Sequence, residues 1–206
     1  QSLEVYTMNK MMKKTLTTSV LGCLFAASTS FAATDMNVAG GTITFNGSVT
    51  DTTCHVTTNG GQDFTVNLAP ISLDDAQTPG VVTAGAKQFS MMVSGCTGYV
   101  ANSSSAQALQ ITFTGANVSP DEMYLENNGG TSTGVGIAIT KDGSDPYPLN
   151  RAITTALTTT SSDGEFFDKD AEGTLTFFAN YYNYAGEGNV TTGSVITSAT
   201  YTFSYE

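Results

Sequence analysis

The sequence has little positive charge, with seven Lys and Arg residues against 18 Asp and Glu and a formal net charge of −11. So acidic a chain argues against a polyanionic partner such as nucleic acid or an anionic membrane surface. It is also short of catalytic and metal-binding residue types, because His55 is its one histidine. No catalytic dyad stands out, and no glycine-rich phosphate loop follows a strand pattern. The sequence therefore predicts a chain that is not an enzyme, with no catalytic residue, no cofactor and no metal site.

The chain also lacks a helical periodicity beyond its first thirty residues. Leu, Glu, Lys and Arg are scarce, whereas Thr, Ser, Gly, Val and aromatic residues are frequent, which is a strand and turn composition. Short runs in which apolar residues alternate, bounded by turn residues, recur along the chain. They lie at residues 42–50, 64–68, 89–96, 109–113, 135–139, 175–182 and 199–205. Polar loops separate them, and no linker divides the chain, so we expect one all-β sandwich.

The first 32 residues have the three parts of a secretory signal peptide. Met8 opens a lysine-rich start, residues 16–27 are apolar and small, and Ser30-Phe31-Ala32 supplies the cleavage site. The apolar stretch is too short for a membrane anchor, which needs about 20 apolar residues. An N-terminal amphipathic helix is the alternative. Residues 1–7 carry no signal that we can interpret. Cleavage would remove more basic than acidic residues and leave about 170 residues, enough for one domain.

Two of the three cysteines remain after this cleavage, because Cys23 leaves with the signal. An even pair in an exported protein predicts a disulfide, here between Cys54 and Cys96. It would close a loop of about 40 residues and stabilise the fold by about 4 kcal/mol in the chain-entropy model. The alternative is two buried free thiols. His55 lies next to this predicted disulfide, and we interpret it as a surface residue.

A short alternating stretch precedes Cys54: Ile43, Phe45, Gly47 and Val49 share one phase. Asn46-Gly47 is also a strong hairpin-turn signal, which would split the stretch into two strands. The apolar phase continues unbroken through Gly47, and the arms of such a hairpin would be too short to pair well. We therefore predict one continuous strand in which Gly47 is a position without a side chain.

Four features, in this order, carry a resemblance to a known family. They are the stretch Gly41–Val49 ahead of Cys54, the strand Phe89-x-Met91-x-Val93 that ends in Cys96, the run Val135-Gly136-Ile137, and a C-terminal pattern from Gly193 to Tyr205. The chain resembles subunits of pili built by the chaperone–usher pathway, and it is most similar to major rod subunits of type 1-like fimbriae. The resemblance covers the chain after the signal peptide.

The resemblance implies an incomplete immunoglobulin-like β-sandwich that lacks its C-terminal strand and is completed by a donor strand from a neighbouring subunit. The donor residues would be Ile43, Phe45, Gly47 and Val49. The strand that borders the open groove, which a chaperone would also bind, would contain Gly193, Ala199, Tyr201, Phe203, Tyr205 and Glu206. Residues 1–32 would be cleaved, 33–53 would form the N-terminal extension, and 54–206 the pilin domain.

The partners that the resemblance implies are identical or related pilin subunits, a periplasmic chaperone and an outer-membrane usher. The protein would pass through the periplasm to a fimbria on the cell surface and support adhesion, with a host-surface receptor met through the assembled fibre. The alternatives are a minor adaptor or tip pilin, and a secreted monomeric β-sandwich that binds sugar or protein.

Three further motifs have a functional and a structural interpretation. Tyr181, Tyr182 and Tyr184 form an aromatic cluster that suits a sugar platform, but we expect strand residues on two faces. Residues 142–145 and 168–173 resemble calcium loops only superficially, because neither has the full ligand spacing with a bidentate Glu at the last position. We interpret both as turns.

Overall fold

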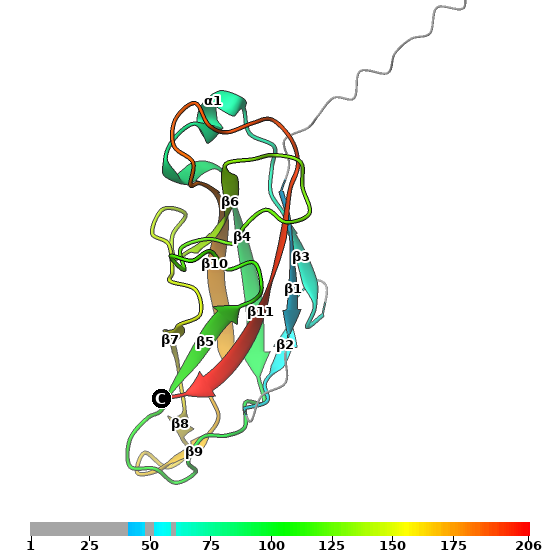
Figure 1. Cartoon of the computed structure of the whole chain (residues 1–206). Coiled ribbons are helices and arrows are strands. Elements are labelled where there is room, and N and C mark those ends of the chain that lie inside the picture. The colour runs from blue at the N-terminus through cyan, green and yellow to red at the C-terminus, as the bar shows by residue number, and fades with distance from the viewer. Residues whose placement is uncertain (1–40, 48–51, 59–60) are drawn as a thin grey trace, which may run out of the picture. The chain divides into compact units, whose positions relative to one another are not determined.

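The computed structural model describes residues 41–47, 52–58 and 61–206, with side chains from residue 52 onward. These residues belong to one unit, Met36–Glu206 (Figure 1). The predicted signal peptide and Val49 lie outside the described residues. The elements, in chain order, are β1 Gly41–Gly47, β2 His55–Thr57, β3 Phe64–Asn67, α1 Leu73–Ala76, β4 Gly80–Ser94, β5 Ala108–Thr114, β6 Val135–Thr140, β7 Ala152–Thr158, β8 Thr160–Ser161, β9 Phe167–Lys169, β10 Gly173–Asn183 and β11 Val195–Tyr205.

The strands form two main sheets. One sheet has the order β3-β1-β11-β5-β7 and the other the order β2-β4-β10-β6, while β8 and β9 pair in a small hairpin. The all-β sandwich that the alternating runs predicted is confirmed. In the described ranges, no helix has the length and apolar character needed to cross a membrane.

The core lies between the two sheets, because alternate residues of each strand point inward. Aromatic rings from opposite sheets meet there. Phe113 of β5 packs edge-on against Phe177 of β10 with centroids 5.3 Å apart, and Phe64 of β3 lies 5.9 Å from Phe89 of β4. Because Phe177 and Phe89 are in register on β10 and β4, these contacts join the two sheets at one level of the core.

Strand β6 is buried at all six positions, unlike the half-buried strands around it. The connection from β5 covers it, since Leu125 exchanges backbone hydrogen bonds with Ile137 at 2.7 and 2.9 Å. Gly136 allows this close approach, because a Cβ atom there would overlap the Leu125 carbonyl oxygen. The glycine of the Val135-Gly136-Ile137 run is thus required by the covering segment.

Candidate functional site

Strand β1 lies between β11 and β3 of its own chain. It runs parallel to β11 and antiparallel to β3. The resemblance to pilus subunits implied an open groove beside β11 that a neighbouring subunit's strand fills. In this structure the chain's own residues Gly41–Gly47 hold that position, and β11 is paired on both sides, with β1 and β5.

The alternate apolar positions of β1 are in register with the alternate buried positions of β11. Ile43 is in register with Thr197, Phe45 with Ala199, and Gly47 with Tyr201. The three β11 residues are buried. In paired strands, residues in register share a face of the sheet, so the alternation that the sequence shows is in phase with the core.

On the β11 side, the register pairs a large residue with a small one at two positions. Ala199, with one methyl group, is the neighbour of Phe45, and the large Tyr201 is the neighbour of Gly47. The Tyr201 ring packs against Phe64 at 6.4 Å, and its hydroxyl donates a 2.8 Å hydrogen bond to the Gln62 carbonyl oxygen. Tyr201 is thereby held in place, which gives a physical reason for the missing side chain at Gly47.

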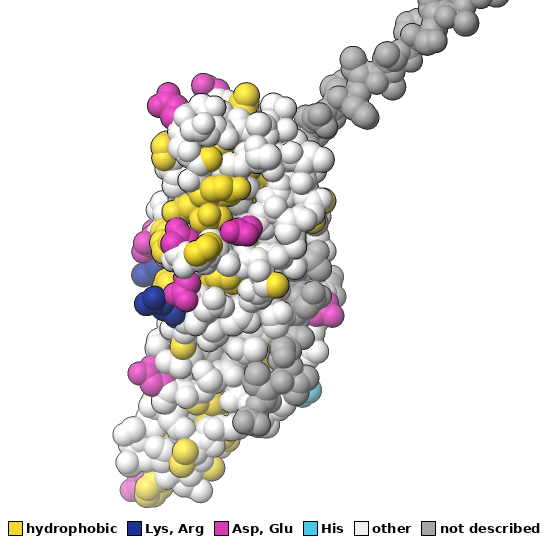
Figure 2. Space-filling view, viewed as in Figure 1, with side chains coloured by type: hydrophobic (Ala, Val, Ile, Leu, Met, Phe, Trp, Pro, Cys, Tyr) yellow, Lys and Arg dark blue, Asp and Glu magenta, His cyan; other side chains and the backbone are white. Residues whose placement is uncertain are grey.

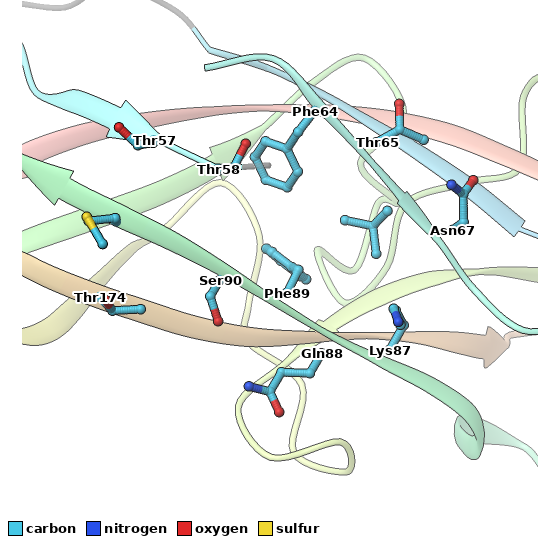
Figure 3. A pocket seen from close by; sticks show the side chains of 12 residues that line it. Thr57, Thr58, Phe64, Thr65, Asn67, Lys87, Gln88, Phe89, Ser90 and Thr174 are labelled. Atoms are coloured by element: carbon cyan, nitrogen blue, oxygen red, sulfur yellow. The ribbon is translucent and has the colours of Figure 1, made fainter. Parts of the chain in front are cut away.

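The other wall of the groove comes from β3, which sequence reasoning recognised as a strand but did not assign to the site. Val66 is in register with Ile43, and Phe64 with Phe45. Phe64 and Phe89 both line an adjoining opening between β3 and β4, a cavity of about 840 Å³ (Figure 3). It lies where the chain passes from β2 in one sheet to β3 in the other. The alternation at residues 64–66 is the signal that points to this wall.

The titration of Tyr201 gives a test of this packing. Burial raises the pKa of Tyr201 to about 12, and Asp63 adds to the rise. The unfolded chain titrates near pH 10, so the stabilising effect of the buried phenol is complete below about pH 10 and is lost as the pH rises towards about 12. We expect Tyr201→Phe to lose less of its free energy of unfolding across this range than the wild type. Urea unfolding at successive alkaline pH values measures it, and equal losses would contradict the assignment.

The remaining predicted edge residues lie at the two ends of β11. Gly193 precedes it with φ +152°, packed so closely against Thr131 and Ser132 that a Cβ atom would overlap their backbone. Phe203 is buried, and the Tyr205 hydroxyl accepts a 3.0 Å hydrogen bond from the Ala171 amide. The Glu206 carboxylate accepts hydrogen bonds from Gln110 and Thr154, at 3.0 and 3.1 Å. Their assignment to a chaperone stays a prediction.

The predicted disulfide is present between Cys54 and Cys96, with Cα atoms 4.1 Å apart. It joins the residue ahead of β2 to the segment that follows β4, and the Cys96 amide donates a 2.9 Å hydrogen bond to Asp170. His55 is exposed beside it, as the sequence indicated. The disulfide thus anchors the start of the sandwich directly after the β1 segment.

The weaker motifs behave as structural elements. The Asp142 carboxylate accepts hydrogen bonds from Ser144 and from the Asp145 amide, which closes a turn. Across the described residues, no group of His, Cys, Asp and Glu has the arrangement to hold a metal ion. Tyr181 points into the core, whereas Tyr182 is half-buried and Tyr184 exposed, so the tyrosines lie on two faces as predicted.

Comparisons with known proteins agree with this architecture. The chain is 32% identical over 170 residues to the major fimbrial subunit SMF-1 of Stenotrophomonas maltophilia (strain K279a), covering 82% of this chain and 94% of that one. It is 29% identical over 202 residues to the fimbrial subunit type 1 of Salmonella typhimurium, covering 95% and 100%. A solved chaperone–usher pilus chain superposes with a TM-score of 0.50 at 20% identity, over 79% of this chain and 93% of that chain, which supports the fold.

The sequence model of the family described as fimbrial protein matches residues 43–206, which include β1 from Ile43 onward and every later element. Members of this family are structural components of surface pili and not enzymes. The sandwich is therefore that of a structural pilin, and the chain belongs to the fimbrial protein family.

Proposed function

We propose that this pilin polymerises head to tail by donor-strand exchange, with residues 42–50 of one subunit completing the β3–β11 groove of the next. The observation that supports the proposal most is the register of β1. It puts Ile43, Phe45 and Gly47 in register with buried residues of β11, with a small neighbour for Phe45 and a large one for Gly47. The groove recognises a sequence, and every copy of the chain carries that sequence. A head-to-tail contact of this kind does not close and so generates a filament.

A subunit's own segment competes with that of a neighbour. A tethered strand has an effective concentration on the order of mM, so it outcompetes a free neighbour in dilute solution. Assembly therefore needs a factor that keeps the groove available, and a periplasmic chaperone that pairs with β11 fits this role. It would contact Gly193, Ala199, Tyr201, Phe203, Tyr205 and Glu206. An outer-membrane usher would then pass the subunits from the periplasm to the surface, where the fibre supports adhesion to a host receptor.

In this function the chain has three parts. Residues 1–32 are removed on export, 33–53 form the extension with the donor strand, and 54–206 form the domain that receives one. Burying Ile43, Phe45 and Val49 would contribute roughly 5–9 kcal/mol, at about 1.5–3 kcal/mol each. Most of the stability of the 54–206 domain would then depend on the strand that it receives.

The test uses a chain that starts at residue 52, with and without a synthetic peptide of residues 41–51. We expect the truncated chain to be unstable and to self-associate, because one row of backbone groups and part of the core are uncovered. The peptide should raise its Tm by more than 10 °C, since a gain of about 1 kcal/mol moves the Tm of such a domain by about 2–4 °C. A peptide with Phe45→Asp is the matched control and should have little effect. A truncated chain that is monomeric and as stable as the full chain would refute the proposal.

A further inference from the structure

Three tyrosine rings stack on the outer side of the β10 sheet, a feature that the pilin fold does not explain. Tyr182 lies on β10, Tyr184 follows the end of that strand, and Tyr124 comes from the connection between β5 and β6. Tyr124 is the middle ring. Its centroid is 4.9 Å from each of the other two, with interplanar angles of 13° and 6°. Nearly parallel rings at this spacing form an offset stack, which is a favourable aromatic geometry.

The stack is only partly used for packing. Tyr124 is only 8% exposed and packs the segment between β5 and β6 against the sheet. Tyr184, in contrast, has 47% of its surface exposed to water. None of the three hydroxyls hydrogen-bonds to another residue in the described part of the chain. A large aromatic side chain that is half-exposed at the end of an ordered stack offers a rigid face to a partner, at a low cost in side-chain entropy.

Two exposed carboxylates, Asp121 and Glu126, lie near this aromatic surface. The Ser119 hydroxyl donates a hydrogen bond to the Asp121 carboxylate and accepts one from the Tyr124 amide, which places this carboxylate close to the stack. Burial raises the pKa of Tyr124 to about 12, and the charges of Asp121 and Glu126 add to the rise. Glu122 is paired with Arg151 at 2.8 Å. Asp121 and Glu126 are exposed, and neither has an ion-pair partner among the described residues. The local charge therefore has the same sign as the net charge of the chain, −11.

We propose that Tyr124, Tyr182, Tyr184, Asp121 and Glu126 form a docking surface for a basic peptide segment of a partner protein. An Arg or Lys side chain lies over the exposed Tyr184 ring in a cation–π contact, and its positive charge is attracted by Asp121 and Glu126. The aliphatic part of that side chain packs along the stack.

Charge complementarity selects this occupant over two others. A second copy of the chain brings 18 acidic and only seven basic residues, and Arg151 is already paired. On the face that Figure 2 shows, acidic side chains are spread widely and Lys and Arg are confined to one place. A neutral sugar could stack on the tyrosine rings, but it would have no favourable electrostatic interaction with the Asp121 and Glu126 carboxylates. A cation gains from both features at once.

Binding of a hexa-arginine peptide to the full-length chain after signal removal tests the proposal, with a Gly-Ser hexapeptide as the uncharged control. Calorimetry at 150 mM salt gives the Kd, and tyrosine ring shifts in NMR locate the contact. We expect Tyr184→Ala to weaken hexa-arginine binding about fivefold or more, and Tyr184→Phe to retain it within about twofold, because the ring and not the hydroxyl meets the cation. Asp121→Asn with Glu126→Gln should weaken it about fivefold.

A charge-matched control separates a site from general attraction. Glu165→Gln with Glu172→Gln removes the same charge near the other end of β10, and it should change the Kd by less than about twofold. Equal losses in the two double variants, or unchanged binding in Tyr184→Ala, would overturn the proposal. So would a methyl galactoside that shifts the Tyr184 ring signals when hexa-arginine does not.

Discussion

Replacing Gly47 with leucine is expected to abolish fibre assembly. The register places position 47 beside Tyr201, which is buried, packed against Phe64 and hydrogen-bonded to Gln62. A leucine side chain there would displace the Tyr201 ring, and overpacking of this kind typically costs about 1–3 kcal/mol. Because every junction of the fibre repeats that cost, we expect the yield of fibres, counted by electron microscopy, to fall by at least about tenfold.

The control is Asn46→Leu, which adds the same side chain one residue earlier, in the opposite phase of the strand. It should assemble at close to the wild-type level, because alternate residues of a strand point to opposite faces. If chaperone binding uses β11 alone, Gly47→Leu should also leave the chaperone complex intact. Normal fibres from the Gly47→Leu variant would contradict the role that we assign to this glycine.

Removing the disulfide is expected to have the second large effect. Changing Cys54 and Cys96 together to serine frees a loop with a sequence separation of 42 residues. The chain-entropy model gives a loss of about 4 kcal/mol, a large part of the stability of a domain of this size. Urea unfolding of the double variant should show this loss, and wild-type protein in a reducing agent should reproduce it.

The matched control keeps the cysteines and removes a nearby contact. Asp170→Asn weakens the hydrogen bond that the Cys96 amide donates, which is 2.9 Å long, and should cost about 1 kcal/mol. A double-serine variant that loses no more than this control would show that the cross-link contributes little.

Strands in which apolar and polar residues alternate were predicted from the sequence. Elements without this alternation were not predicted. Strands β5, β10 and β11 were predicted from every second residue being apolar, and the structure confirms them. The first half of β4, with Gly85 at φ +72°, reads Gly-Val-Val-Thr-Ala-Gly-Ala and has no such period. Helix α1 has only four residues, too few for a helical pattern to appear.

The sequence proposed the residues of the candidate site, and the resemblance implied β11 as their neighbour, but neither gave the register or the second neighbour, β3. The phase of Ile43, Phe45 and Gly47 was readable, because period-2 alternation identifies a strand with one buried face. Which strand that face meets depends on contacts far apart in the sequence, and residue spacing does not encode them. The structure adds the parallel register with β11, the wall formed by β3 and the position of Gly47 in register with Tyr201. The stacking of Tyr124 between Tyr182 and Tyr184 could likewise not be predicted from the sequence, because nearly 60 residues separate Tyr124 from the other two along the chain.

The most direct test of donor-strand exchange follows a tagged chain of residues 52–206 in fibres of untagged wild-type subunits. Such a chain has a groove but no donor strand. It can receive the donor strand of one neighbour, but it cannot donate a strand to another subunit. A tagged full-length subunit is the control, and its gold label should appear all along the fibres in electron micrographs. Our account predicts that label on the truncated subunit appears only at one end of each fibre. Label distributed along the fibres would contradict it.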